Sequence, residues 1–230
     1  MKLTHAPERP PSKAERANAV RLPIPAARLE LQGDLILPEI CRGVVLFAHG
    51  SGSSRFSTRN RFVAQQLRQA ELGTLLIDLF SPDEERIDQH TAHLRFDIDL
   101  LANRLVAAID WLLIHPATLN LPIGLFGAST GGGAALVAAA RRPEDIQAVV
   151  SRGGRPDLAG PALRRVEAPT LLIVGGDDTA VIRMNRDAYE QMHCERRLEI
   201  VPGASHLFEE PGTLEEVARL AREWFERTLR

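Results

Sequence analysis

Leu121-Pro-Ile-Gly-Leu-Phe-Gly-Ala-Ser-Thr-Gly-Gly-Gly133 is the stretch of this 230-residue chain that decides its fold. A short apolar strand is predicted to run into a sharp turn carrying Ser129, and a helix is expected over Thr130–Ala140. Gly127 and Gly131 flank the serine in a G-x-S-x-G pattern. Such a turn strains the serine backbone and leaves little room for side chains at the two glycines. The serine hydroxyl would then project freely above a helix N-terminus.

Composition limits the classes of protein to consider. Hydrophobic residues make up 44% of the chain and charged residues 25%, with a formal net charge of -2. These values are typical of a globular domain and give no electrostatic reason to expect nucleic acid or an anionic membrane as a partner. The two cysteines, Cys41 and Cys194, indicate no disulfide framework, and no apolar run resembles a signal peptide or a membrane span. We therefore expect a cytoplasmic protein.

Strands alternate with helices along most of the chain. Residues 1–16 are expected to be a polar N-terminal tail, and residues 17–230 a single domain. The predicted strands are Val20–Pro25, Leu29–Leu37, Gly43–Ala48, Leu72–Asp78, the strand before Ser129, Ala148–Ser151, Thr170–Gly175 and Leu198–Val201. The predicted helices are Phe62–Ala70, Leu94–Leu113, the helix after Ser129, Ala180–Met192 and a last one from Thr213. This order predicts an α/β fold with a mostly parallel sheet, helices on both faces and antiparallel N-terminal edge strands.

Chemically useful residues follow four of the predicted strands. His49-Gly50-Ser51, Ser129, Asp177-Asp178 and His206 each come directly after a strand. Because sites in such folds gather at the carboxyl ends of the strands, we expect these residues to lie together. Their order along the chain, serine then acid then histidine, is that of the α/β-hydrolases.

The chain resembles the α/β-hydrolase superfamily, and in particular its dienelactone hydrolase-like branch of small serine hydrolases. The resemblance covers the chain from about Ala17 onward. It is carried by the motifs His49-Gly50-Ser51-Gly52, Gly127-Ala128-Ser129-Thr130-Gly131, Gly175-Gly176-Asp177-Asp178 and Gly203-Ala204-Ser205-His206. Position 129 is a serine, whereas dienelactone hydrolases proper use a cysteine nucleophile.

The resemblance implies a catalytic triad and an acyl-enzyme. Ser129 would be the nucleophile, His206 the base that takes its proton, and Asp178 the acid that orients the imidazole. The amides of Ser51 and Thr130 would form the oxyanion hole. The substrate would be a small ester or lactone, and no cofactor or metal is expected. With the same triad an acyltransferase or perhydrolase stays possible, as does a non-catalytic binding protein on a hydrolase scaffold. The sequence does not decide the oligomeric state.

Three arginines are candidates for substrate binding. Arg152 and Arg155 follow a strand directly and could hold a substrate carboxylate, or they could form an internal ion pair with Asp157 or brace the loop. Arg55, beyond the predicted oxyanion loop, has the same two readings. The chain between Arg152 and Pro169 is too short for a lid, so an open site is expected. His49 is interpreted as structural. The segment Ser81–His93 is interpreted as a polar loop whose acidic run is solvated and whose histidines bind no metal.

Overall fold

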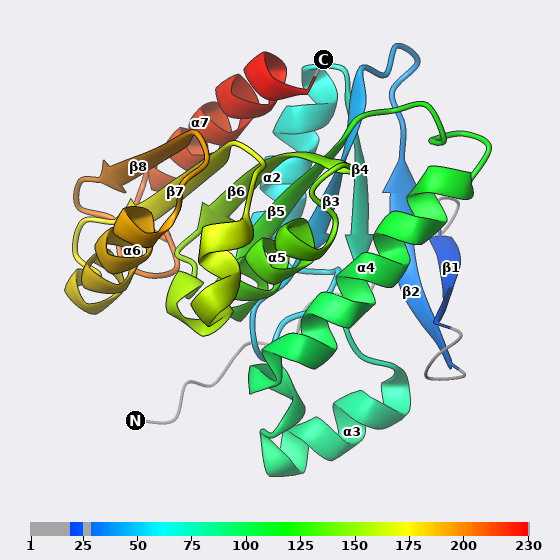
Figure 1. Ribbon diagram of the computed structural model, residues 1–230, viewed down its shortest axis with the longest axis horizontal. Coiled ribbons are helices and arrows are strands. Elements are labelled where there is room, and N and C mark those ends of the chain that lie inside the picture. Colours follow the sequence, from blue (N-terminus) through cyan, green and yellow to red (C-terminus); the bar gives the residue numbers. More distant parts are fainter. Residues whose placement is uncertain (1–18, 25–28, 230) are drawn as a thin grey trace.

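One sheet organises the protein. The computed structural model describes residues 19–24 and 29–229, so the predicted tail over residues 1–16 lies outside the described residues. Within those ranges the strands form a sheet of eight, in the order β1-β2-β4-β3-β5-β6-β7-β8 (Figure 1). Their bounds are β1 Ala19–Ile24, β2 Leu29–Ile36, β3 Gly43–Ala48, β4 Leu72–Ile77, β5 Ile123–Ala128, β6 Ile146–Arg152, β7 Thr170–Gly175 and β8 Arg196–Val201.

The sheet is parallel except at one edge. β1 and β2 pair antiparallel with each other, and β2 pairs antiparallel with β4. From β4 to β8 every neighbouring pair is parallel. Strands β3, β4, β5 and β7 are buried along their whole length, as expected of strands covered on both faces. The prediction of an α/β fold with antiparallel N-terminal edge strands is confirmed.

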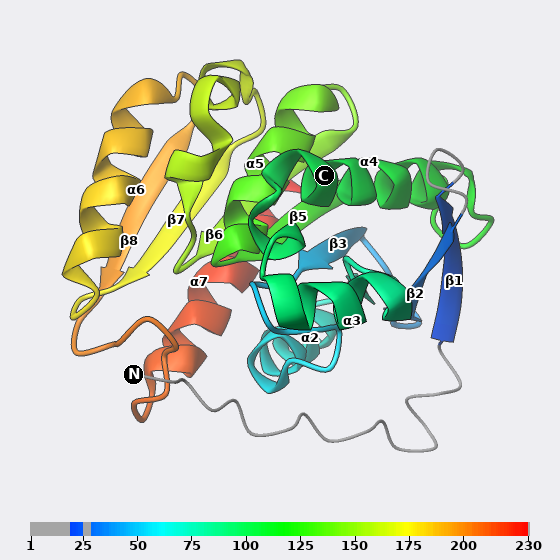
Figure 2. The same cartoon turned by 90° about the horizontal axis from the view of Figure 1, so that it is seen from below.

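Helices cover both faces of the sheet and enclose two separate cores. Figure 2 shows α2 and α7 on one side and α4, α5 and α6 on the other. One core joins the sheet to α4 and α5, and the second joins it to α2 and α7. The bounds are α2 Thr58–Gln69, α3 Pro82–Thr91, α4 Ile98–Ile114, α5 Thr130–Arg141, α6 Thr179–Gln191 and α7 Thr213–Thr228, with short 3₁₀ segments η2 Leu94–Phe96 and η3 Pro156–Arg165.

The prediction of a polar loop over Ser81–His93 is wrong, because this segment contains helix α3. Ser81 caps the helix by accepting from the Glu84 amide, while the Glu84 carboxylate accepts from the Ser81 amide. Pro82 occupies the first helical position, where its missing N–H costs nothing. Glu84 also pairs with Arg104, a buried side chain of α4, at 2.6 Å. The acidic run is therefore part of a helix start and an ion pair, and only part of it is solvated.

The connection between β6 and β7 contains η3 and no inserted lid domain. The absence of a lid, expected from the short chain between these strands, is thus confirmed. Across residues 19–24 and 29–229, no helix combines the length and the apolar character needed to cross a membrane.

Candidate active site

Ser129 lies in a strained turn between β5 and α5. Its backbone has φ 52° and ψ -122°, a combination that L-residues with a Cβ rarely adopt. A Cβ added at Gly127 would lie 2.4 Å from the Gly131 carbonyl oxygen, and one at Gly131 would lie 2.4 Å from the Ala48 carbonyl oxygen. Side chains at either position would force these backbone segments apart. The two glycines therefore permit the turn that presents the serine.

Neighbouring backbone holds the strained serine in place. The Ser129 amide donates to the Arg152 carbonyl at 3.2 Å, and the Arg155 amide donates to the Ser129 carbonyl at 3.0 Å. The end of β6 is thus tied to both sides of the serine. Hydrogen bonds of this kind offset the cost of the unusual dihedral angles, because the surrounding structure leaves the residue no alternative.

Asp178 and His206 form a hydrogen-bonded pair. The two residues follow β7 and β8, and His206 Nδ1 lies 2.6 Å from Asp178 Oδ2. A carboxylate only accepts, so Nδ1 carries the proton and Nε2 is left with a free lone pair. The Asp178 side chain is 15% exposed and that of His206 is 39% exposed. Although Asp178 precedes α6, its side chain makes no capping hydrogen bond to that helix. Asp177, in contrast, is exposed.

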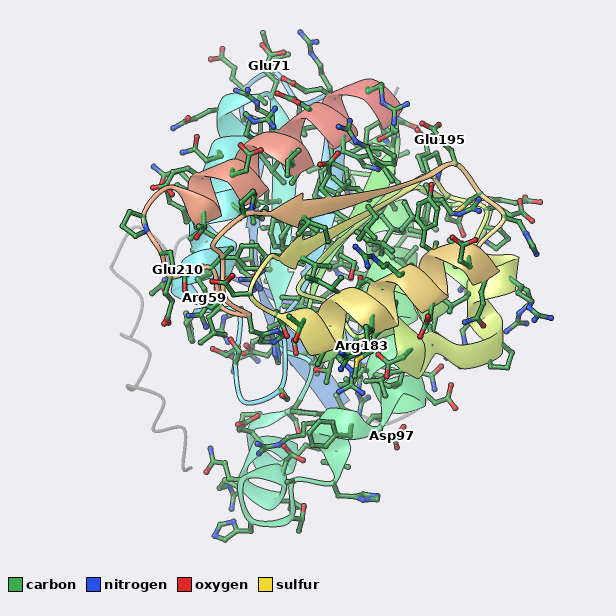
Figure 3. The ribbon with its side chains drawn as sticks, turned by 90° about the vertical axis from the view of Figure 1, so that its left-hand side faces the viewer. Arg59, Glu71, Asp97, Arg183, Glu195 and Glu210 are labelled. Carbon is green, nitrogen blue, oxygen red and sulfur yellow. The ribbon has the colours of Figure 1, made fainter. Side chains whose placement is uncertain are left out.

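The loop that carries His206 is held by two glutamates that sequence reasoning missed. The Ser205 amide donates to Glu210 Oε2 at 3.0 Å, and this hydrogen bonding lowers the pKa of Glu210. Glu209 pairs with Arg59 of α2 at 3.2 Å. Figure 3 shows Arg59 and Glu210 at the same edge of the molecule. The pair Arg59–Glu209 joins residues 150 positions apart, so no local pattern could have revealed it.

The end of β6 contacts both Ser129 and His206, so the two residues lie at the same edge of the sheet. Gly153 follows the residue that binds the Ser129 amide, and a Cβ built on it would lie 3.6 Å from His206 Cε1. Among the described residues, the Ser129 hydroxyl has no hydrogen-bond partner. In enzymes without bound substrate, the hydrogen bond between a nucleophile and its base is often long and shortens only when the substrate binds.

The predicted oxyanion donors lie on either side of Ser129. Thr130 is the first residue of α5 and is buried, so its amide belongs to the helix start, whose N–H groups have no partner within the helix. Ser51 is half-buried in the loop after β3. A Cβ on the preceding Gly50 would lie 3.0 Å from Ser129 Cβ, so this loop packs directly against the serine.

His49 has a structural environment. The Leu79 amide donates to His49 Nε2 at 3.0 Å, so Nε2 is unprotonated, and Nδ1 donates to the Gly50 carbonyl at 2.9 Å. Both ring nitrogens are occupied: Nε2 joins the end of β3 to the end of β4, and Nδ1 fixes the ring to its own loop. This arrangement agrees with the structural interpretation of the residue.

Two of the three candidate arginines are engaged by carboxylates. Arg55 pairs with Asp78 and lies 3.6 Å from Asp34. Arg155 makes a two-pronged contact with Asp157, at 2.9 and 2.7 Å. The hydrogen bonds that Arg155 donates to Asp157 raise the pKa of Arg155. For Arg155 the structure thus favours the internal ion pair over a contact with substrate.

Arg152 differs, because it is buried without a carboxylate partner among the described residues. It is 7% exposed, and its Nε and Nη1 have no hydrogen-bond partner there. Nη2 donates to Asn60 Oδ1 at 3.4 Å, and the guanidinium lies 5.9 Å from the centre of the Phe208 ring. Burial and the nearby charge of Arg59 lower the pKa of Arg152 to about 9. A buried cation in this position is stabilised by any anion that reaches it.

Within the described ranges, no three or more His, Cys, Asp or Glu side chains lie close enough together to hold a metal ion. Asp88 of α3 accepts from the Leu94 and Arg95 amides and from Arg95 Nε.

Comparison with known proteins shows the family of this chain. Residues 54–230 match the dienelactone hydrolase family. The chain belongs to the dienelactone hydrolase family. It is 63% identical to a dienelactone hydrolase from Anabaena variabilis ATCC 29413 of known crystal structure, covering 92% of this chain and 97% of that one, with a TM-score of 0.90. The prediction from sequence motifs that the chain is dienelactone hydrolase-like is confirmed.

A structure with the same fold and two longer relatives add two facts. XC6422 from Xanthomonas campestris, an α/β serine hydrolase without a lid, has a TM-score of 0.71 at 20% identity, covering 92% of this chain and 94% of that one, and shares the fold. Two Mycobacterium tuberculosis proteins, from strains CDC 1551 and H37Rv, are named "Putative phosphoribosyl transferase" and are 55% identical over 216 residues. That match covers 94% of this family member, which spans about half (47%) of each relative's length.

Proposed function

We propose that this member of the dienelactone hydrolase family is a serine hydrolase of small carboxylic esters or lactones. The observation that carries the proposal is the 2.6 Å contact between His206 and Asp178. Ser129, whose backbone dihedral angles are strained, is joined to the same edge of the sheet through the end of β6. His206 and Asp178 form the base-and-orienter pair that a serine nucleophile requires. The family match and the lidless fold support the same reaction.

The reaction would proceed through an acyl-enzyme. Ser129 Oγ attacks the substrate carbonyl carbon while His206 Nε2 takes the hydroxyl proton, and Asp178 stabilises the imidazolium that forms. The Ser51 and Thr130 amides donate to the carbonyl oxygen as it becomes negative, a contribution of about 3–4 kcal/mol per donor. His206 then returns the proton to the leaving alkoxide. Water, activated by the same histidine, releases the acid and restores Ser129.

We also propose that the substrate carries an acidic group and that Arg152 receives it. The support is a buried guanidinium with two donor nitrogens unused among the described residues, at the end of the strand that holds the Ser129 amide. A carboxylate could accept from such a group in a two-pronged, charge-assisted contact. Arg55 and Arg155 are less suited, because each already contacts an aspartate.

The name of the Mycobacterium tuberculosis relatives suggests a second activity for those longer proteins. We propose that phosphoribosyl transfer belongs to the half of each relative that lies outside the match, because the matched part here adopts a hydrolase fold. Assaying this chain for phosphoribosyl transfer tests the assignment, and measurable transfer would contradict it.

Labelling with a fluorophosphonate, followed by hydrolysis assays on short p-nitrophenyl esters and lactones, tests the proposed hydrolase. Wild-type protein should be labelled at Ser129 and should turn over at least one of these substrates. Ser129→Ala should abolish both while the fold persists, since one hydroxyl contributes little to stability. Product analysis with an added alcohol or peroxide distinguishes hydrolysis from acyl transfer. Absence of labelling in folded wild-type protein would favour a non-catalytic binding protein.

A further inference from the structure

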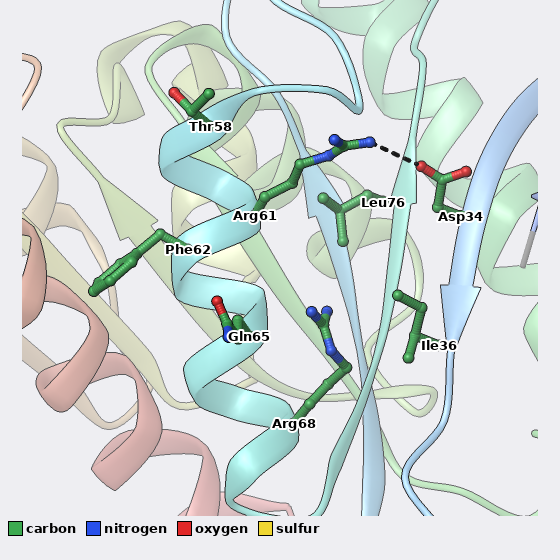
Figure 4. Close-up of a pocket in the computed structure, with 8 residues that line it drawn as sticks. All are labelled: Asp34, Ile36, Thr58, Arg61, Phe62, Gln65, Arg68 and Leu76. Carbon is green, nitrogen blue, oxygen red and sulfur yellow. Dashed lines mark ion pairs between the residues drawn. The ribbon is translucent and has the colours of Figure 1, made fainter. Parts of the chain in front are cut away.

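A pocket separate from the candidate active site lies between α2 and the β2–β4 edge of the sheet. Its volume is about 340 Å³, at the lower end of the range of small-molecule sites. Figure 4 shows two arginines of α2, Arg61 and Arg68, extending from the helix toward the strands. They are seven residues apart and so lie on the same face of the helix. None of the candidate catalytic or oxyanion residues lines this pocket.

Among the described residues that line the pocket, arginines outnumber carboxylates. Arg61 lies 3.5 Å from Asp34, which is also 3.6 Å from Arg55. Arg68 contacts no carboxylate among the described residues; Nη1 donates to the Thr74 hydroxyl at 2.9 Å. In the part of the chain that the structure describes, the lining therefore holds two guanidinium groups and one carboxylate. Burial, together with the charge of Arg61, lowers the pKa of Arg68.

The remaining walls are partly apolar. Leu76 of β4 and Ile36 of β2 face the space in front of Arg68 (Figure 4). An inorganic anion would satisfy the arginine but would leave these walls in contact with water. A molecule with a carboxylate at one end and an apolar body would satisfy both features, because burial of its body adds hydrophobic stabilisation to the charge-assisted contact.

We propose that this pocket binds a small organic acid, with its carboxylate on Arg68 and its apolar body against Ile36 and Leu76. Arg61 is already paired with Asp34 at 3.5 Å, so the carboxylate is assigned to Arg68 alone. The inference concerns binding alone and does not depend on the proposed hydrolase reaction.

Calorimetric titration with benzoate tests the proposal, with benzamide as the neutral analogue of the same shape. Benzoate should bind wild-type protein and benzamide should not. Arg68→Gln should weaken benzoate binding at least about tenfold, because the charge-assisted contact is lost. Arg68→Lys should retain part of the affinity, and Arg222→Gln, at an exposed position of α7, should bind as the wild type does. Thermal unfolding of each variant checks that it is folded.

Backbone amide shifts in nuclear magnetic resonance locate the bound benzoate. Shifts centred on Ile36, Arg68 and Leu76 would support the proposal, whereas shifts confined to Ser129 and His206 would overturn it by assigning benzoate to the candidate active site. Unchanged affinity in Arg68→Gln, or no binding of benzoate, would also overturn it. If inorganic phosphate bound as tightly as benzoate through Arg68, the pocket would be a general oxyanion site and the organic-acid assignment would be wrong.

Discussion

At the scale of single residues, two adjacent aspartates in the candidate site have different environments. Asp178 contacts the His206 ring at 2.6 Å, while the exposed Asp177 donates its backbone amide to the Ala204 carbonyl at 3.0 Å. Asp177 therefore ties the turn after β7 to the loop after β8 through its main chain, and Asp178 uses its side chain across the same gap. One residue of difference in register decides which carboxylate reaches the imidazole.

Asparagine substitutions should give very different rates at these two positions. Asp178→Asn keeps the shape but offers His206 the wrong tautomer, a change that costs about 10⁴ in kcat in serine proteases. Asp177→Asn should cost less than about tenfold, or about 1.4 kcal/mol of barrier. Steady-state rates of both variants on one activated ester measure the effect. A severe loss in Asp177→Asn alone would contradict the assignment of Asp178.

Arg152 should control the preference for charged substrates. Arg152→Gln should lower the ratio of kcat/KM for an anionic ester over its neutral counterpart about tenfold, because the buried cation is lost. Arg152→Lys should preserve part of the ratio. Arg155→Gln is the matched control and should leave the ratio unchanged, since Arg155 is paired with Asp157. If the wild type showed equal kcat/KM for the two esters, Arg152 would have no role in substrate charge selection.

At the scale of elements, α3 and η2 form a small unit that is held by polar contacts. Asp88 is 1% exposed and accepts from the Leu94 amide at 2.7 Å and from Arg95 Nε at 2.6 Å. Burial alone would raise the pKa of Asp88, but the hydrogen bonds from Arg95 and Leu94 outweigh it and lower the pKa. A single buried carboxylate thus connects the end of one helix to the start of the next segment.

Asp88 should make stability depend on acid pH. Because its pKa is lowered by folding, its stabilising contribution is complete above the unfolded-state pKa of about 3.9 and is lost as the pH falls through the lower folded-state pKa. Urea unfolding at neutral pH should show Asp88→Asn to be less stable than the wild type by about 1–3 kcal/mol. That difference should shrink on acidification below about pH 3.9. Asp83→Asn, at an exposed position of the same helix, should show neither effect.

The elements also show what sequence could predict and why the rest escaped. The continuous apolar runs of β3, β5 and β7 and the glycine spacing around Ser129 are local signals, and each predicted its element. Helix α3 escaped because only Asp88 of its residues is buried, so it has no apolar stripe. The predicted helix Leu94–Leu113 is divided because Asp97 caps α4 by accepting from the Leu100 amide.

The arginine environments escaped for a different reason. The partners of Arg55 include Asp78, 23 residues away, and Arg152 meets Asn60 across 92 residues. Only the folded sheet brings such positions together. The sequence therefore indicated where the candidate site lies, at the carboxyl ends of the strands, but it could not indicate which arginine is left without a carboxylate.

At the scale of the whole molecule, the C-terminal helix closes the second core. Phe225 of α7 is fully buried, and a Cβ built on Gly124 of β5 would lie 2.7 Å from its ring. The helix therefore sits directly on the strand that leads to Ser129. The same contacts therefore stabilise the sheet and hold the strand that positions Ser129.

Phe225→Ala should destabilise the protein by about 3–5 kcal/mol, the usual cost of removing a buried aromatic ring. Glu226→Ala, its exposed neighbour, should change stability by less than about 0.5 kcal/mol. Denaturant unfolding of both variants measures the difference. A loss below about 1 kcal/mol for Phe225→Ala would contradict a closing role for α7.

Helix α2 contacts parts of the candidate site that are synthesised much later than the helix itself. The first turn of this early helix holds Glu209 through Arg59 and reaches Arg152 through Asn60. A chain leaving the ribosome exposes Ser129 long before His206 has been made, and contacts that span such distances form late in folding. The nascent protein therefore carries Ser129 without the His206–Asp178 pair until the loop after β8 has emerged.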